Sequence, residues 1–279
     1  MNQLTRVQVK QNTLYKYLSE LEAYQSSNFQ AHAHLGLLIE YMKNAYTVIT
    51  QHLNSLLQND EITFGLVWTL FKHNTLIYTT CPGTGKPRCI RYNFGKMVIM
   101  GNAEYFCIEG HYLDYNGRAL GKVSEVLTIQ QFQGTKLIST LKAFPLHYHQ
   151  NADEVQLRLT DYGRKFVFLR EAHHVQYQGM AFQMKNGVPV KIQVNSRVVI
   201  DAAFFCKKNP NYPRPFIKGR NGNVIDINLL NLPGNKMQGM DPTEMSGDDF
   251  LLCSPTVLGF SLGNKLWCKW SQVAYNYQS

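Results

Sequence analysis

The run Cys81–Cys89 comes closest in this sequence to a nucleotide-binding loop. Its Gly85-Lys86 pair matches part of the phosphate-loop pattern G-x-x-x-x-G-K-[ST], but that pattern also needs Gly at position 80 and Ser or Thr at 87, where the chain has Thr80 and Pro87. Pro87 lacks both the hydroxyl that would bind magnesium and a backbone donor, and β-prone residues follow it instead of a helix. We therefore predict a Gly-rich turn between two strands, and no nucleotide site.

A second motif, Gly259-Phe260-Ser261-Leu262-Gly263, matches the G-x-S-x-G pattern of a hydrolase nucleophile elbow. That elbow needs a strand before it and a helix after it, whereas the residues that follow here predict a turn and a strand. The triad histidine also follows the serine in that fold, and the last histidine of this chain is His174. A hydrolase with Ser261 as its nucleophile is the enzymatic hypothesis, and both observations weigh against it.

The histidines form pairs but no complete metal site. In a strand, His147 and His149 would share one face and could supply two ligands, while the adjacent His173 and His174 would point apart. Neither a cysteine nor a carboxylate stands at a supporting spacing. We therefore expect surface or hydrogen-bonded histidines, and we predict no catalytic residue, no cofactor-binding residue and no metal ligand.

Length and composition indicate an ordered globular protein. The chain has 279 residues, of which 44% are hydrophobic and 12% aromatic, enough for one large or two ordinary domains. It has no run of about 20 apolar residues and no signal-peptide pattern at its start, so we expect no membrane insertion and a cytoplasmic or nuclear location. Its six cysteines contain no C-x-x-C pair, which predicts free, mostly buried thiols. A redox pair of Cys81 and Cys89 stays open as an alternative.

The net charge of +9 comes from residues 136–220, which contain 14 basic and 5 acidic residues. Such a region attracts phosphate backbones or an acidic protein face, although a solvated basic surface without a partner has the same composition. At its end, aromatic and basic residues alternate, which suits stacking on single-stranded nucleic acid or clamping an acidic peptide. The candidate partner-binding residues are Lys207, Lys208, Tyr212, Arg214, Lys218 and Arg220.

Helical periodicity is strongest near the N-terminus. Apolar residues recur at alternating spacings of four and three along residues 32–58, so we predict one helix whose apolar stripe docks on the rest of the protein or pairs with another helix. The stripe is Leu35, Ile39, Met42, Tyr46, Ile49, Leu53 and Leu56. A weaker helix precedes it around Leu14 to Leu21. Asn59 and Asp60 would cap a short helix through Phe71, and residues 152–171 predict a further helix that Gly163 weakens.

Strand periodicity begins at Thr75. Residues 76–80 and 89–94 bracket the Gly-rich turn, and residues 103–115 and 118–129 flank Asn116-Gly117, a strong hairpin signal. Later strands are predicted at residues 179–184, 188–194 and 197–200, with a tight turn at Asn186-Gly187 and a last hairpin over residues 257–270. Residues 207–243 are rich in Pro, Gly and Asn and predict a long surface loop or a partly disordered insertion.

These elements predict an α+β fold. N-terminal helices would pack on a mainly antiparallel β region with one inserted helix, and a barrel-like form of that region is left open. We expect an N-terminal helical segment over residues 1–60, followed by a β-rich accessory domain over residues 61–279 with its long loop at 207–243.

Seven short segments, taken in order, resemble the uncharacterised N-terminal domain of fungal AAA+ ATPases. Each is weak alone, and together they cover roughly residues 35–270. They are Trp68-Thr69-Leu70-Phe71-Lys72, the run 79–89, Gly163-Arg164-Lys165-Phe166, Ala172-His173-His174, Ser196-Arg197-Val198-Val199-Ile200-Asp201, Asn209-Pro210-Asn211-Tyr212, and Leu252-Cys253-Ser254-Pro255 through Gly259-Phe260-Ser261.

The resemblance implies an accessory domain that has no ATPase residues of its own. In that family the ATPase core, with its Walker A and Walker B motifs, follows this domain, and neither motif is present in this sequence. The expected function is recognition of a client or adaptor protein, with the AAA+ core of a longer parent chain as a further partner. The alternative is a basic nucleic-acid-binding module that uses residues 136–220.

Overall fold

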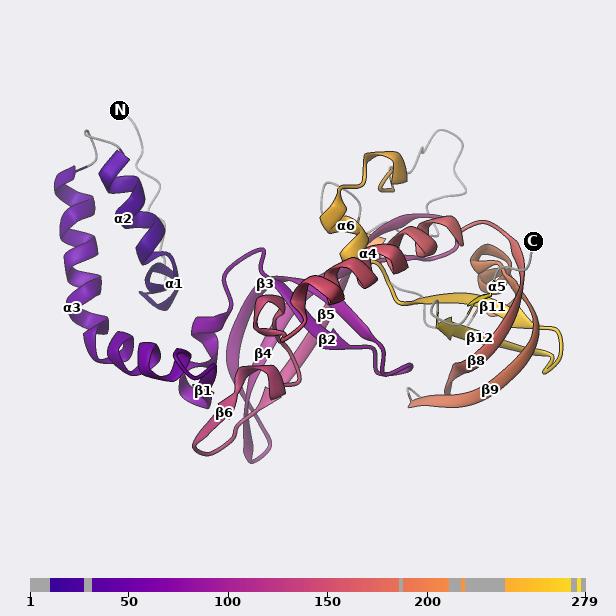
Figure 1. Cartoon of the computed structure of the whole chain (residues 1–279), viewed down its shortest axis with the longest axis horizontal. Coiled ribbons are helices and arrows are strands. Elements are labelled where there is room, and N and C mark those ends of the chain that lie inside the picture. Colours follow the sequence, from indigo (N-terminus) through magenta and orange to yellow (C-terminus); the bar gives the residue numbers. More distant parts are fainter. Residues whose placement is uncertain are drawn as a thin grey trace.

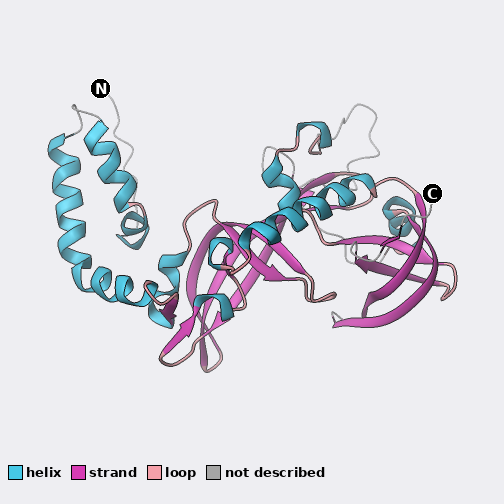
Figure 2. Cartoon of the chain, viewed as in Figure 1, coloured by secondary structure: helices cyan, strands magenta, loops and turns pink. Residues whose placement is uncertain are grey.

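The computed structural model describes residues 11–27, 32–185, 188–210, 217–218, 239–271 and 275–276. It confirms the α+β class: helices at the N-terminus pack on a β region whose strands pair antiparallel (Figure 1). The β region contains two main sheets, and Figure 2 shows a long helix running between them. None of the described helices is both long and apolar enough to cross a membrane.

Three helices begin the described chain: α1 (Gln11–Lys16), α2 (Leu18–Ser27) and α3 (His32–Leu57). The apolar stripe predicted for α3 is confirmed, since Ile39, Met42, Tyr46, Leu53 and Leu56 are all buried. The stripe packs against two parts of the protein, helix α1 and the core of the first sheet. Tyr46 stacks on Tyr15 of α1 with ring centroids 4.4 Å apart, whereas Leu53 and Leu56 belong to the core beneath the first sheet.

The first sheet has the strand order β10-β5-β4-β3-β2-β7. β1 and β6 form a separate two-stranded sheet. The core of the first sheet contains the end of α3 and the 3-10 helix η2 (Phe64–Leu70). The strands are β1 (Glu61–Thr63), β2 (Leu76–Thr80), β3 (Pro87–Met100), β4 (Ala103–Tyr115), β5 (Leu120–Gln130), β6 (Thr135–Leu137), β7 (Phe144–Pro145) and β10 (Ile217–Lys218). Two short 3-10 turns, η3 (Ile138–Thr140) and η4 (Leu146–Tyr148), follow β6 and β7.

The two predicted turns of this sheet are confirmed. In the Gly-rich turn, the N–H of Cys81 donates to the carbonyl of Lys86 at 2.8 Å, and Gly85 has a φ of 68°. In the β4–β5 turn, Gly117 has a φ of 90°, and the Asn116 side-chain oxygen accepts from the N–H groups of Arg118 and Ala119. Glycine takes these positive φ angles without the strain that a Cβ atom imposes.

Three local predictions for residues 59–149 were wrong. The short helix through Phe71 is the 3-10 helix η2, and Asp60 does not cap it because β1 intervenes and Asp60 itself has a φ of 53°. β3 continues to Met100, six residues beyond its predicted end. His147 and His149 lie in and after η4 rather than in a strand, so they do not share a strand face.

The second sheet returns on itself. Its order is β12-β11-β9-β8-β13, and β12 also pairs with β8 at Lys269↔Phe182 and Trp270↔Ala181, so pairing runs through β8, β9, β11 and β12 and back to β8. The strands are β8 (His173–Lys185), β9 (Val188–Ile200), β11 (Thr256–Ser261), β12 (Leu266–Ser271) and β13 (Tyr275–Asn276). The predicted turn at Asn186-Gly187 lies outside the described residues, and β8 and β9 pair antiparallel as far as Lys185↔Val188.

Helix α4 (Ala152–Phe168) is the predicted inserted helix, and it packs with the short helix α6 (Gly247–Leu251). One core joins α4 to both sheets, because it contains Leu113 of β4, Leu159 of α4 and Trp270 of β12. The predicted loop at 207–243 is corrected where it is described: α5 (Ala202–Lys208) covers its first residues, and Ile217 is fully buried as part of β10. Most of that loop lies outside the described residues.

Candidate binding site

Two of the six predicted partner-binding residues lie on a described surface. Lys207 and Lys208 are exposed in the last turn of α5. Lys218 lies in β10, but its side chain is outside the described residues, as are Tyr212, Arg214 and Arg220. The structure therefore brings together the two lysines and leaves the other four predictions open.

The cap of α5 determines which of its side chains face solvent. An oxygen of the Asp201 carboxylate accepts a hydrogen bond from the N–H of Phe204 at 2.8 Å, which starts the helix. In the helix that begins after Asp201, Phe205 is buried, whereas Phe204 is 45% exposed. The ammonium of Lys208 lies 5.4 Å from the centroid of that ring, within the range of a cation–π contact.

Trp267 of β12 extends this surface with three aromatic neighbours. Its ring centroid lies 5.8 Å from that of Phe204, 5.4 Å from that of Phe205 and 4.9 Å from that of Phe260. A cavity of about 280 Å³ opens beside these rings, with Asn209 and Lys265 among its lining residues. We call Phe204, Lys207, Lys208, Lys265 and Trp267 the α5–β12 surface.

The α5–β12 surface combines exposed aromatic area with positive charge. Aromatic rings bury a large apolar area at a protein interface, and neighbouring ammonium groups attract carboxylates or phosphates. The sequence analysis missed Phe204 and Trp267, since they lie 63 positions apart and no local spacing relates them. The only sequence signal was Asp201, a residue type that starts helices, placed just before Phe204 and Phe205.

A second hollow lies among the N-terminal helices. It has a volume of about 570 Å³ and is lined by Lys16 of α1, Glu22 of α2, Lys43 and Thr50 of α3, and by Lys72. Lys43 forms an ion pair with Glu22 at 2.5 Å, and Lys72 forms one with Glu20 at 2.6 Å. The hollow could hold a small ligand, since its volume falls within the usual range of such sites.

Lys16 lines this hollow and has a lowered pKa. Burial lowers its pKa from 10.5 to about 8, because a charged ammonium loses water there. Its Nζ lies 5.8 Å from the ring centroid of Trp68 and 5.6 Å from that of Tyr92. No carboxylate within ion-pair distance of it is found in the described part of the chain. Lys16 could therefore accept an anionic group.

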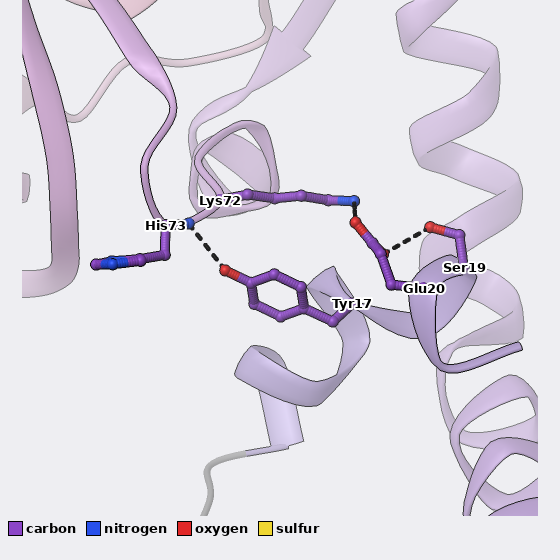
Figure 3. Close-up of polar contacts among 5 residues, drawn as sticks. All are labelled: Tyr17, Ser19, Glu20, Lys72 and His73. Carbon is purple, nitrogen blue, oxygen red and sulfur yellow. Dashed lines mark hydrogen bonds and ion pairs between the residues drawn. The ribbon is translucent and has the colours of Figure 1, made fainter. Parts of the chain in front are cut away.

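Polar contacts tie α1 and α2 to the first sheet next to this hollow (Figure 3). The backbone N–H of His73 donates to the hydroxyl of Tyr17 at 2.9 Å, and Glu20 accepts from Lys72 and, at 2.8 Å, from Ser19. The hydrogen bond from Lys72 is the largest cause of the lowered pKa of Glu20, since it favours the charged carboxylate. These contacts hold the helices against the segment that leads into β2.

The site proposed for a hydrolase does not have the geometry of one. Ser261 is fully buried, and its hydroxyl lies 3.0 Å from the Ser196 hydroxyl and 3.0 Å from the side-chain oxygen of Asn264, while it accepts from the Asn264 N–H at 3.1 Å. A nucleophilic serine needs a base beside it and access to substrate. Ser261 instead stabilises the β11–β12 turn, and this geometry weighs further against a role as nucleophile.

The buried charges between the sheets also form a structural network. Arg88 forms an ion pair with Glu125, and its guanidinium lies 5.2 Å from the ring centroid of Tyr112. Burial raises the pKa of the neighbouring Asp114 carboxyl, which accepts from the N–H of Tyr115 at 2.8 Å. Neither Asp114 nor Glu125 lines the cavity beside Trp267 or the hollow among the N-terminal helices.

The described histidines and cysteines have structural surroundings. His149 packs against the rings of Tyr78 and Phe144, and His173 contacts the carbonyl of Phe168 at 2.9 Å. Within the described ranges, no three His, Cys, Asp or Glu side chains gather as metal ligands. All six cysteines are free and buried, as predicted, and Cys81 and Cys89 form no disulfide.

Comparison with known proteins identifies one family likeness. A family model described as a domain of unknown function (DUF7025) matches residues 52–150. That span begins near the end of α3 and stops before α4, so it covers most of the first sheet and the 3-10 helices η2, η3 and η4. No curated protein matches the chain, and no solved structure matches it.

Proposed function

We propose that this chain is a non-catalytic accessory domain that recognises a client or adaptor protein through the α5–β12 surface. The main observation in support of this role is the exposed ring of Phe204, which lies beside Trp267 and next to Lys207 and Lys208. A parent AAA+ ATPase is part of the proposal because seven sequence segments resemble the N-terminal domain of that family. The DUF7025 match assigns no activity, so it neither favours nor opposes this role.

The chemistry of the surface defines the partner. Lysines on α5 and at the β11–β12 turn would attract acidic side chains, and an aromatic or aliphatic side chain of the partner would pack on the exposed surface of the Phe204 and Trp267 rings. The cavity of about 280 Å³ has room for one such side chain. We therefore expect an acidic segment with a single apolar anchor residue.

Site-specific photocrosslinking tests this proposal. A benzoylphenylalanine placed at Phe204 should crosslink a specific protein in the cells that make this chain, and the double change Lys207→Glu and Lys208→Glu should reduce that crosslink at least about tenfold because it removes the charge attraction. The matched control places the same probe at Val126, an exposed residue of the first sheet. A crosslink that persists after charge reversal, or that forms equally at Val126, would argue against the surface.

The link to an ATPase needs its own experiment. If residues 1–279 deliver a client to a parent motor, deleting them should abolish stimulation of ATP hydrolysis by the crosslinked protein while basal hydrolysis remains. Full stimulation after the deletion would contradict the accessory role.

Nucleic-acid binding is the second candidate, because Lys208 lies over the exposed ring of Phe204 and pairs a cation with a stacking platform. Part of the basic excess of residues 136–220 is already neutralised, since Arg158 and Lys165 of α4 form ion pairs with Glu154 and Asp161. Fluorescence anisotropy with single-stranded RNA and DNA over a salt titration decides the matter. Binding at low salt that vanishes when Lys207, Lys208, Arg214 and Arg220 are changed to Glu would support this candidate.

A further inference from the structure

Among the described residues, one edge of β3 is open over the last seven residues of the strand. β2 pairs with β3 only from Leu76↔Arg91 to Thr80↔Pro87, and Tyr92 then bonds to Asn74 and Thr75. Residues 94–100 pair with β4 on one side, and no strand in the described part of the chain pairs with their other side. The open segment reads Phe-Gly-Lys-Met-Val-Ile-Met.

The ladder to β4 shows which backbone groups face this edge. The pairing ends at Met100↔Ala103 around a two-residue turn, and in such a hairpin the closing pair is hydrogen-bonded. Backbone groups alternate in direction along a strand, so Met100, Val98 and Lys96 point their N–H and C=O groups toward β4. Gly95, Met97 and Ile99 therefore point theirs at the open edge.

The side chains of this segment do little to protect the edge. Ile99 is 75% exposed, and Phe94, Met97 and Met100 are exposed as well. Edge strands in natural proteins are commonly blunted by charges, proline or short length. Here a seven-residue apolar run contains one charged residue, Lys96, and no proline.

We propose that two copies of this chain pair through this edge, antiparallel and centred on Met97, so that two first sheets join into one. In that register Met97 faces Met97 of the second copy, Gly95 faces Ile99, Lys96 faces Val98 and Phe94 faces Met100. The groups that point at the edge, on Gly95, Met97 and Ile99, then meet one another across the two-fold axis. An antiparallel two-fold pairing is self-complementary by construction.

The side chains favour this register over its neighbours. Ile99 of the second copy would lie over Gly95, beside the ring of Phe106 that already approaches the Gly95 position. A register centred on Lys96 would place two lysines directly opposite each other, which destabilises a strand pair. A register centred on Val98 would place Gly95 opposite Gly101 of the turn. The centre at Met97 uses all seven residues and separates the charges.

Cysteine crosslinking of the full chain tests the register. Hydrogen-bonded antiparallel partners have Cα atoms about 5.5 Å apart, a separation that a disulfide spans. Met97→Cys should therefore give a disulfide-linked dimer under mild oxidation. The control is Val126→Cys, which is exposed on β5, separated from β3 by β4, and should stay monomeric. The native cysteines are all buried, so they should not crosslink in either variant.

Sedimentation equilibrium of the uncrosslinked protein completes the test. The natural chain should be dimeric at micromolar concentration, and Met97→Lys, which puts two ammonium groups across the axis, should weaken the dimer at least about tenfold with an unchanged circular dichroism spectrum. A monomeric natural chain, equal crosslinking at Val126→Cys, or a dimer unaffected by Met97→Lys would each overturn the proposal. The α5–β12 surface is not involved, so its photocrosslinks are independent of this outcome.

Discussion

Gly163 of α4 lies against the backbone of Phe250 in α6. A Cβ atom at position 163 would lie 2.0 Å from the carbonyl oxygen of Phe250, far inside van der Waals contact. The glycine that weakens α4 as an isolated helix is therefore the residue that lets the two helices approach.

Replacing Gly163 with Ala should destabilise the protein by about 1–3 kcal/mol, because α6 must move to admit the methyl group. Urea denaturation followed by circular dichroism would measure the change in the free energy of unfolding. Gly65→Ala is the matched control, since nothing lies within 4 Å of its Cβ position, and its effect should stay within about 0.5 kcal/mol. Equal effects of the two changes would show that the α4–α6 contact is not tight.

Tyr17→Phe should loosen α1 and α2 without unfolding the sheets. The change removes the hydroxyl that accepts from the His73 N–H, a hydrogen bond with a net contribution of about 0.5–1.5 kcal/mol. Hydrogen exchange should quicken in residues 11–27 and stay the same in β4 and β5. Tyr24→Phe provides the control, since Tyr24 is an exposed tyrosine of α2. Faster exchange throughout the chain would mean that the contact supports the whole fold.

The Lys16 ammonium should titrate with a midpoint of about 8, which the ¹³Cε chemical shift of that residue would record. Between pH 8 and 10.5 the unfolded chain holds more protons at this site than the folded chain does, so the free energy of unfolding should rise with pH across that window. Below pH 8 the burial penalty is fully present. Lys16→Met should remove this part of the pH dependence. A midpoint near 10.5 would show that Lys16 is solvated.

Ser261→Ala should cost about 0.5–1.5 kcal/mol of stability, because it removes the hydrogen bonds that the buried Ser261 hydroxyl makes with Ser196 and Asn264. Thermal unfolding would measure the loss. A fluorophosphonate probe for active serines should react no faster with the natural chain than with Ser261→Ala. Labelling that disappears on this substitution would restore the hydrolase hypothesis.

Local periodicity was sufficient to predict the long elements of this protein. The stripe from Leu35 to Leu56 predicted α3, and alternation around Asn116-Gly117 predicted β4 and most of β5. These patterns work because one buried face imposes the period of a helix or a strand on neighbouring residues. They failed at Asp60, where the pairing of β1 with β6, a partner more than 70 residues away, replaced the expected helix cap.

The sequence by itself determined the helical stripe, the hairpins and the character of the Gly-rich turn at Cys81–Cys89. Tertiary structure decided what those elements meet: Gly83 of that turn packs on the Phe182 ring of the second sheet, and Phe204 meets Trp267. In the part of the chain that the structure describes, β3 also continues past the last residue that pairs with β2. The physical reason is that contacts between distant segments depend on how whole elements pack, and residue spacing along the chain carries no record of that packing.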